Sequence, residues 1–102
     1  MDTKDLTVDL LAASDKYNLK GLFNKCQLNL CQNIDIGNAA NYFHAAYLHE
    51  EAAVLKKTTI QFIIDNYKEV KKTTGFAKIQ QLSKALMEIL DEAIGKLSVS
   101  QS

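Results

Sequence analysis

The sequence has no proline, no tryptophan and no arginine, and it contains only four glycines and two cysteines among 102 residues. Proteins rich in β-turns need glycine and proline at their corners, so the scarcity of both residues favours helices. Nucleic-acid-binding proteins usually carry a basic surplus and read guanine with arginine, whereas 12 lysines here balance 12 acidic residues. No apolar run approaches the roughly 18 residues of a membrane span. We therefore expect no nucleic-acid partner and no membrane partner.

The residues that are present fit one small globular domain. Apolar residues make up 47% of the chain and charged residues 24%, a balance typical of folded proteins. Two cysteines without a recognisable secretory signal indicate free thiols in a reducing compartment. We therefore expect an intracellular protein, located in the nucleus, the cytoplasm or both.

Apolar residues recur at helical spacing along nearly the whole chain. The pattern predicts an all-α fold, a small bundle of about five antiparallel-paired helices. The expected helices cover about residues 7–17, 19–33, 38–49, 52–72 and 76–96, and the tail 98–102 is expected to fray. Asp35 is predicted to cap the third helix, and Gly75 is predicted to end the fourth in the left-handed conformation.

The stretch CQLNLCQNIDIGNAANYFHAAYLH, residues 26–49, has the cysteine and histidine spacing of a DNA-reading zinc finger. Its four candidate ligands are Cys26, Cys31, His44 and His49. The segment CQLNLC lacks a glycine for a tight knuckle and continues a helical face, on which residues five apart diverge by about 140°. Because Cys26 shares a face with Phe23 and Leu30, we expect it to be buried. We predict no metal and no cofactor, with a zinc-binding nucleic-acid module as the alternative.

A second pattern is more specific. The string DLLAASDKY, residues 9–17, is followed at family spacing by apolar residues and by both cysteines. It resembles the end of the BTB/POZ domain in the speckle-type POZ protein family, whose members also have an N-terminal MATH domain. NAA at 38–40, LH at 48–49 and TTGF at 73–76 match the helices that follow. The resemblance covers residues 6–76 well and residues 77–102 only loosely.

This resemblance implies that residues 1–33 are the C-terminal helices of a BTB/POZ domain. Residues 34–97 then correspond to the BACK-like extension, which includes the paired helices called the three-box. In the family these segments help to bind the N-terminal region of cullin-3, and the adaptor presents a substrate for ubiquitination. We thus expect a non-enzymatic interaction module of an E3 ubiquitin ligase adaptor. The BTB sheet and its main cullin-contacting motif are absent, so we expect a fragment of a longer protein or a truncated relative.

The resemblance also nominates contact residues. In the family the turn between the last two BTB helices lies near the cullin scaffold, and here that turn consists of Lys16, Tyr17, Asn18 and Leu19. Tyr17 is the expected anchor, because its ring offers a large contact area at low entropic cost. The alternative is that Tyr17 is a core aromatic packed on the second helix.

The C-terminal helix carries two apolar stripes when it is drawn at about 100° per residue. The first consists of Ile79, Leu82, Leu86, Ile89, Ala93 and Leu97, and the second of Met87, Leu90 and Ile94. One stripe is enough for docking on a core, so we expect the second to be exposed. In the resembling family this region mediates self-association, which implies a homo-oligomer with a contact centred on Leu90. The alternative is that both stripes are buried inside the bundle.

Other functions have less support in the sequence. A helical carrier of a lipid or small ligand would require a cavity among the helices. No glycine-rich phosphate loop is present, and spacing supports no serine–histidine–aspartate arrangement. We therefore expect no enzymatic activity.

Overall fold

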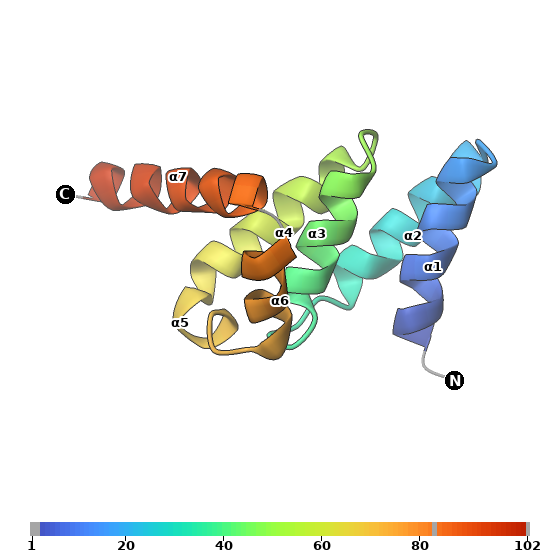
Figure 1. Ribbon diagram of the computed structural model, residues 1–102. Coiled ribbons are helices and arrows are strands. Elements are labelled where there is room, and N and C mark those ends of the chain that lie inside the picture. Colours follow the sequence, from blue (N-terminus) through green and yellow to red (C-terminus); the bar gives the residue numbers. More distant parts are fainter. Residues whose placement is uncertain (1–2, 83, 102) are drawn as a thin grey trace.

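The computed structural model describes residues 3–82 and 84–101. These residues form helices and no strand, which confirms the predicted all-α fold. The helices are α1 (Thr3–Lys16), α2 (Lys20–Gln32), α3 (Ala39–Leu48), α4 (Ala53–Asp65), α5 (Tyr67–Val70), α6 (Thr74–Leu82) and α7 (Lys84–Gln101). Two helical hairpins, α1–α2 and α3–α4, lie next to each other, and α7 extends away from them toward the C-terminus (Figure 1). None of the helices in the described ranges is both long enough and apolar enough to cross a membrane.

Helix α3 lies at the centre of the core and contributes to two apolar clusters. Six of its ten residues are buried, and four of those six are alanines, so neighbouring helices can approach its backbone closely. The first cluster joins α3 to α4, α5, α6 and α7, and consists of Ala39, Ala40, Phe43, Ile63, Val70, Phe76, Ile79, Leu86 and Leu90. The second joins α3 to α1, α2 and α4, and consists of Leu11, Phe23, Cys26, Leu30, Tyr42, Ala46, Ala52 and Leu55. Two adjacent faces of one helix thus hold the two halves of the molecule together.

The turn before α3 is closed by its own side chains. The backbone N–H of Asn38 donates to Asp35 Oδ1 at 2.9 Å, and the backbone N–H of Asp35 donates to Asn38 Oδ1 at 2.8 Å. This reciprocal pair has the form of a capping box. The prediction that Asp35 caps the third helix is wrong, because α3 begins at Ala39 with Asn38 at its N-cap position, and Asp35 caps the turn that leads into the helix.

The single helix predicted over residues 52–72 is wrong, because the chain bends at Asn66 between α4 and α5. The Asn66 backbone N–H and its side-chain Nδ2 both donate to the Phe62 carbonyl oxygen at 3.0 Å. An asparagine side chain that competes in this way for a helical carbonyl interrupts the regular pattern. The break turns α5 back toward the core, where Val70 is fully buried.

The prediction that Gly75 ends a helix is also wrong. Gly75 lies inside α6, and none of the glycines, all of which are described, has a positive φ. Gly75 lies where α6 contacts α3 and the turn before it. A Cβ added there would lie 3.7 Å from Ala40 Cβ and 3.7 Å from the Gly37 carbonyl oxygen. Thr73, the residue before α6, caps this helix, since its Oγ1 accepts the Phe76 N–H at 3.2 Å.

The single C-terminal helix predicted over residues 76–96 is wrong as well. Two helices occupy this region, with α6 ending at Leu82 and α7 beginning at Lys84. They run in different directions (Figure 1). Helix α7 continues to Gln101, into the segment for which we expected fraying.

The first turn of α4 is capped from another helix. No side chain of its own caps this helix, whose N-cap residue is Ala52. The Leu55 N–H donates instead to Gln27 Oε1, across from α2, at 2.9 Å in a buried position. Gln27 is only 4% exposed, so water does not replace this bond. The hydrogen bond therefore ties α2 to the start of α4.

We predict that Gln27→Met lowers the free energy of unfolding by about 1–3 kcal/mol, because a side chain of similar shape without an acceptor leaves the Leu55 N–H unsatisfied. Urea denaturation followed by circular dichroism measures this loss. The matched control is Gln32→Met, at an exposed position near the end of the same helix. Equal stability of the two variants would show that the bond from Gln27 contributes nothing.

Candidate interaction surface

The turn between α1 and α2 is a tightly bonded helix end. Asn18 has φ 58°, the left-handed conformation that asparagine tolerates better than most residues. The Leu19 N–H donates to the Ser14 carbonyl at 2.8 Å, and the Asn18 N–H donates to the Asp15 carbonyl at 3.1 Å. This pair of bonds defines a Schellman motif, which fixes the path of the backbone out of α1. We call residues 16–19 the α1–α2 tip.

The α1–α2 tip exposes two large apolar side chains on this fixed backbone. Tyr17 is 66% exposed and Leu19 is 50% exposed. The alternative that Tyr17 is a core aromatic is therefore wrong. The Lys16 Nζ lies 5.6 Å from the centre of the Tyr17 ring, a cation–π distance, and the ammonium stays in solvent beside the ring. All four residues that the sequence analysis named at this turn are exposed.

A histidine connects the tip to the turn between α3 and α4. His49 Nδ1 lies 2.7 Å from Asp15 Oδ2, and the edge of the Phe23 ring faces the imidazole at 6.2 Å between ring centres. Leu48, next to His49 in the chain, is 65% exposed. Both turns lie at the same end of the molecule, at the top of Figure 1. Sequence reasoning misses the Asp15–His49 pair because 34 residues separate its members.

The two-cysteine, two-histidine set does not assemble into a metal site. Cys26 is buried in the second cluster, as predicted, and burial raises the pKa of its thiol. Cys31 is half-buried at the edge of that cluster. His49 pairs with Asp15, whereas His44 lines a different cavity beside α6. Within the described part of the chain no three metal-ligating side chains converge, so the zinc-finger alternative loses its geometric basis.

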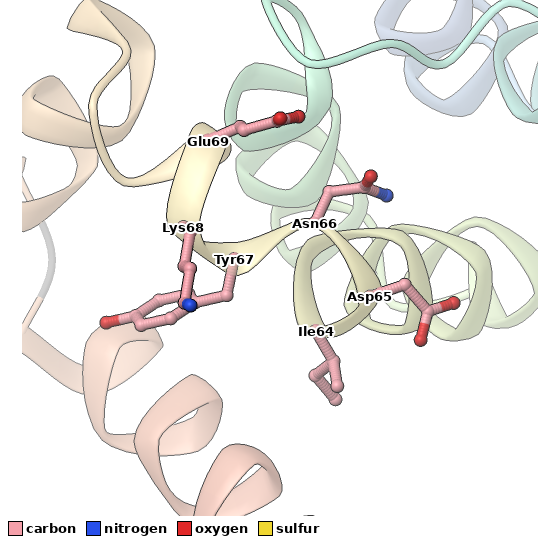
Figure 2. A pocket seen from close by; sticks show the side chains of 6 residues that line it. All are labelled: Ile64, Asp65, Asn66, Tyr67, Lys68 and Glu69. Carbon is pink, nitrogen blue, oxygen red and sulfur yellow. The ribbon is translucent and has the colours of Figure 1, made fainter.

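The cavity at the bend between α4 and α5 does not resemble a carrier's ligand chamber. It has a volume of about 460 Å³ and is formed by the consecutive residues 64–69, where α4 turns into α5 (Figure 2). In Figure 2, Tyr67 and Lys68 extend to one side, while Asn66 and Glu69 point to another. Side chains that diverge from one short stretch of chain neither enclose a lipid nor bring catalytic groups together.

The expectation that Leu90 forms the centre of an exposed stripe is wrong. Leu90 is 1% exposed and belongs to the first cluster, against which Met87 also packs. Ile89, assigned to the docking stripe, is instead 37% exposed. The two predicted stripes assumed one continuous helix. Because α6 and α7 are separate helices, residues assigned to the same stripe do not share one face. The Ile94 side chain lies outside the described residues.

The chain has relatives among curated proteins, although it matches no profile of a known protein family. It is 31% identical over 102 residues, all of this chain, to TD and POZ domain-containing protein 2 of Mus musculus, of which the match covers 27%. It is 37% identical over 76 residues, 74% of this chain, to 20% of TD and POZ domain-containing protein 4 of Mus musculus. It is 35% identical over 78 residues, 76% of this chain, to 20% of protein maternal effect lethal 26 of Caenorhabditis elegans.

The chain therefore spans about a quarter or less of the length of these relatives. Two of them are POZ domain-containing proteins by name. They agree with the BTB/POZ resemblance drawn from the sequence, and the first of them is similar over the whole chain, including the loosely matched residues 77–102.

We predict that Leu90→Ala lowers the free energy of unfolding by about 2–5 kcal/mol, because it leaves a cavity in a packed core. The matched control Ile89→Ala should cost less than about 1 kcal/mol, since that side chain is partly in solvent. Chemical denaturation measures both changes, and sedimentation velocity reports the assembly state. A Leu90→Ala variant that kept its stability but changed its sedimentation would restore the interface assignment.

Proposed function

We propose that this chain is a non-enzymatic protein–protein interaction module, the C-terminal part of a POZ-type adaptor of an E3 ubiquitin ligase. Residues 1–33 would be the last helices of the POZ domain, and residues 34–97 the BACK-like extension with its three-box. The relatives with POZ in their names support the first assignment.

The proposed partner is the N-terminal region of cullin-3, and the proposed contact is the α1–α2 tip. The observation that carries this proposal is the pair of exposed apolar side chains, Tyr17 and Leu19, on a turn that hydrogen bonds hold in place. A preorganised backbone loses little conformational entropy on binding, and a tyrosine ring buries a large area with few rotatable bonds. Lys16 beside the ring adds a positive charge at the rim, which favours an acidic partner surface.

The Asp15–His49 pair has a supporting role in this proposal. It joins the end of α1 to the turn that carries Leu48, so both turns can present apolar groups in a constant relative position. Leu48 then extends the contact area beyond the tip. A role in ubiquitination would put the protein inside the cell, in the nucleus or the cytoplasm.

We predict that Tyr17→Ala and Leu19→Ala each weaken binding to the N-terminal region of cullin-3 by about tenfold or more, the effect of removing a hot-spot side chain. Because both side chains are exposed, the thermal midpoint should stay unchanged. Biolayer interferometry with the full chain and the purified cullin-3 region measures the affinities.

The matched control for this experiment is Leu28→Ala, which removes a leucine of similar exposure, 55% against 50% for Leu19, from the surface of α2. It should leave binding intact. Wild-type binding that survives both tip substitutions would remove the tip from the interface. A chain that does not bind the cullin-3 region at all would overturn the proposed partner.

A further inference from the structure

A second concave site lies at the other end of the molecule from the α1–α2 tip. The cavity has a volume of about 310 Å³ and is formed where α3, α6 and the turn before α3 meet. Its lining residues are Gly37, Asn41, His44, Thr74, Gly75, Lys78, Ile79 and Leu82. Figure 1 shows α6 and the turn before α3 at the bottom of the view, away from the two hairpin turns. Gly75 lies at the crossing of α6 and α3, where an added Cβ would be in ordinary van der Waals contact with Ala40 and Gly37.

The lining of this cavity has an unusual charge balance. It includes a lysine, a histidine, an amide and a hydroxyl, but no carboxylate. Three other cavities in the described part of the chain each include at least one aspartate or glutamate. The carboxylate nearest in sequence, Asp35, accepts the Asn38 N–H and lies beside the cavity without lining it, since a Cβ added at Gly37 would be 3.5 Å from its Oδ1. The cavity is therefore rich in hydrogen-bond donors and carries a positive charge from Lys78.

The polar groups of this cavity are not used by the fold. Among the described residues, no hydrogen bond or ion pair engages the side chains of Asn41, His44, Thr74 or Lys78. Asn41, Thr74 and Lys78 are exposed and His44 is half-buried, so all four side chains are accessible to a ligand.

Apolar groups complete the site. Ile79 is 3% exposed and belongs to the core, so the cavity rests on a rigid apolar wall. Leu82 also lines the cavity, and its side chain is 68% exposed to solvent. A free inorganic anion would use the donors but would leave this leucine in water. A ligand with an anionic group next to an apolar group would use both.

We propose that this cavity binds an acidic peptide segment, in which an aspartate or glutamate is followed by an apolar residue. The carboxylate would accept hydrogen bonds from Lys78 and His44, and the neighbouring apolar side chain would lie against Leu82. A cavity of 310 Å³ is near the lower limit for ligand sites, which suits one or two side chains better than a whole cofactor. Lysine binds as a point charge on a flexible stem, so the site would accept either acidic residue. This proposal uses no residue of the tip and does not depend on cullin binding.

The test is a titration of the ¹⁵N-labelled full chain, followed by NMR, with the blocked peptide acetyl-Asp-Leu-amide. The expected result is saturable shifts of the backbone amide signals of Asn41, His44, Gly75 and Lys78. The isosteric peptide acetyl-Asn-Leu-amide, which lacks the charge, should bind about ten- to a hundredfold more weakly. Equal binding of the two peptides would overturn the assignment of a carboxylate site.

Two variants and two free anions complete the test. Lys78→Glu should abolish saturation by the aspartyl peptide and Leu82→Ser should weaken it, whereas Lys57→Glu, on the surface of α4, should leave it unchanged. Circular dichroism verifies that each variant is folded. Sodium acetate and inorganic phosphate are titrated separately, and either anion binding as tightly as the peptide would reduce the site to one for free anions. If no probe shifts these signals, the proposal is wrong.

Discussion

The burial of α3 between two apolar clusters is the constraint on which the rest of the structure depends. Its alanines allow α4 and α6 to pack against its backbone, while Phe43 and Tyr42 fill the first and second clusters. Substitution of a small residue here by a larger one would force the neighbouring helices apart. The exposed turns at one end and the polar cavity at the other are held at fixed positions because the same helix supports both.

A chain without proline must end its helices by other means, and here polar side chains do so. Asn18 adopts the left-handed conformation at the end of α1. The Asn66 side chain donates a hydrogen bond to the Phe62 carbonyl oxygen at the end of α4. Asp35 and Asn38 bond to each other before α3, and Thr73 caps α6. Such turns are specific, because each depends on the donors and acceptors of a particular residue. These hydrogen bonds also restrict the conformation of the turns between helices, so side chains on the turns are presented in one geometry.

The sequence predicts the helical content and the buried position of Cys26, because both depend on local periodicity. It does not predict the break at Asn66, where one side-chain hydrogen bond outweighs a continuous apolar pattern. The same limit explains the error at Leu90, since stripes are defined only as far as a helix is unbroken. The turn at 16–19 was identified through family resemblance, but its link to His49 is a tertiary contact between distant segments. The cavity beside Gly75 likewise exists only after α3 and α6 have crossed.

The hydrogen bond from Gln27 to the start of α4 has a consequence for how the chain is divided. The proposed boundary between a POZ part and a BACK-like part lies between residues 33 and 34, yet α2 supplies the cap that α4 lacks. The second cluster also spans this boundary, since Phe23 and Leu30 on one side pack with Tyr42 and Leu55 on the other. The folding unit therefore crosses the proposed boundary. A recombination event that exchanged one side alone would have to bring a compatible partner for the amide at Leu55.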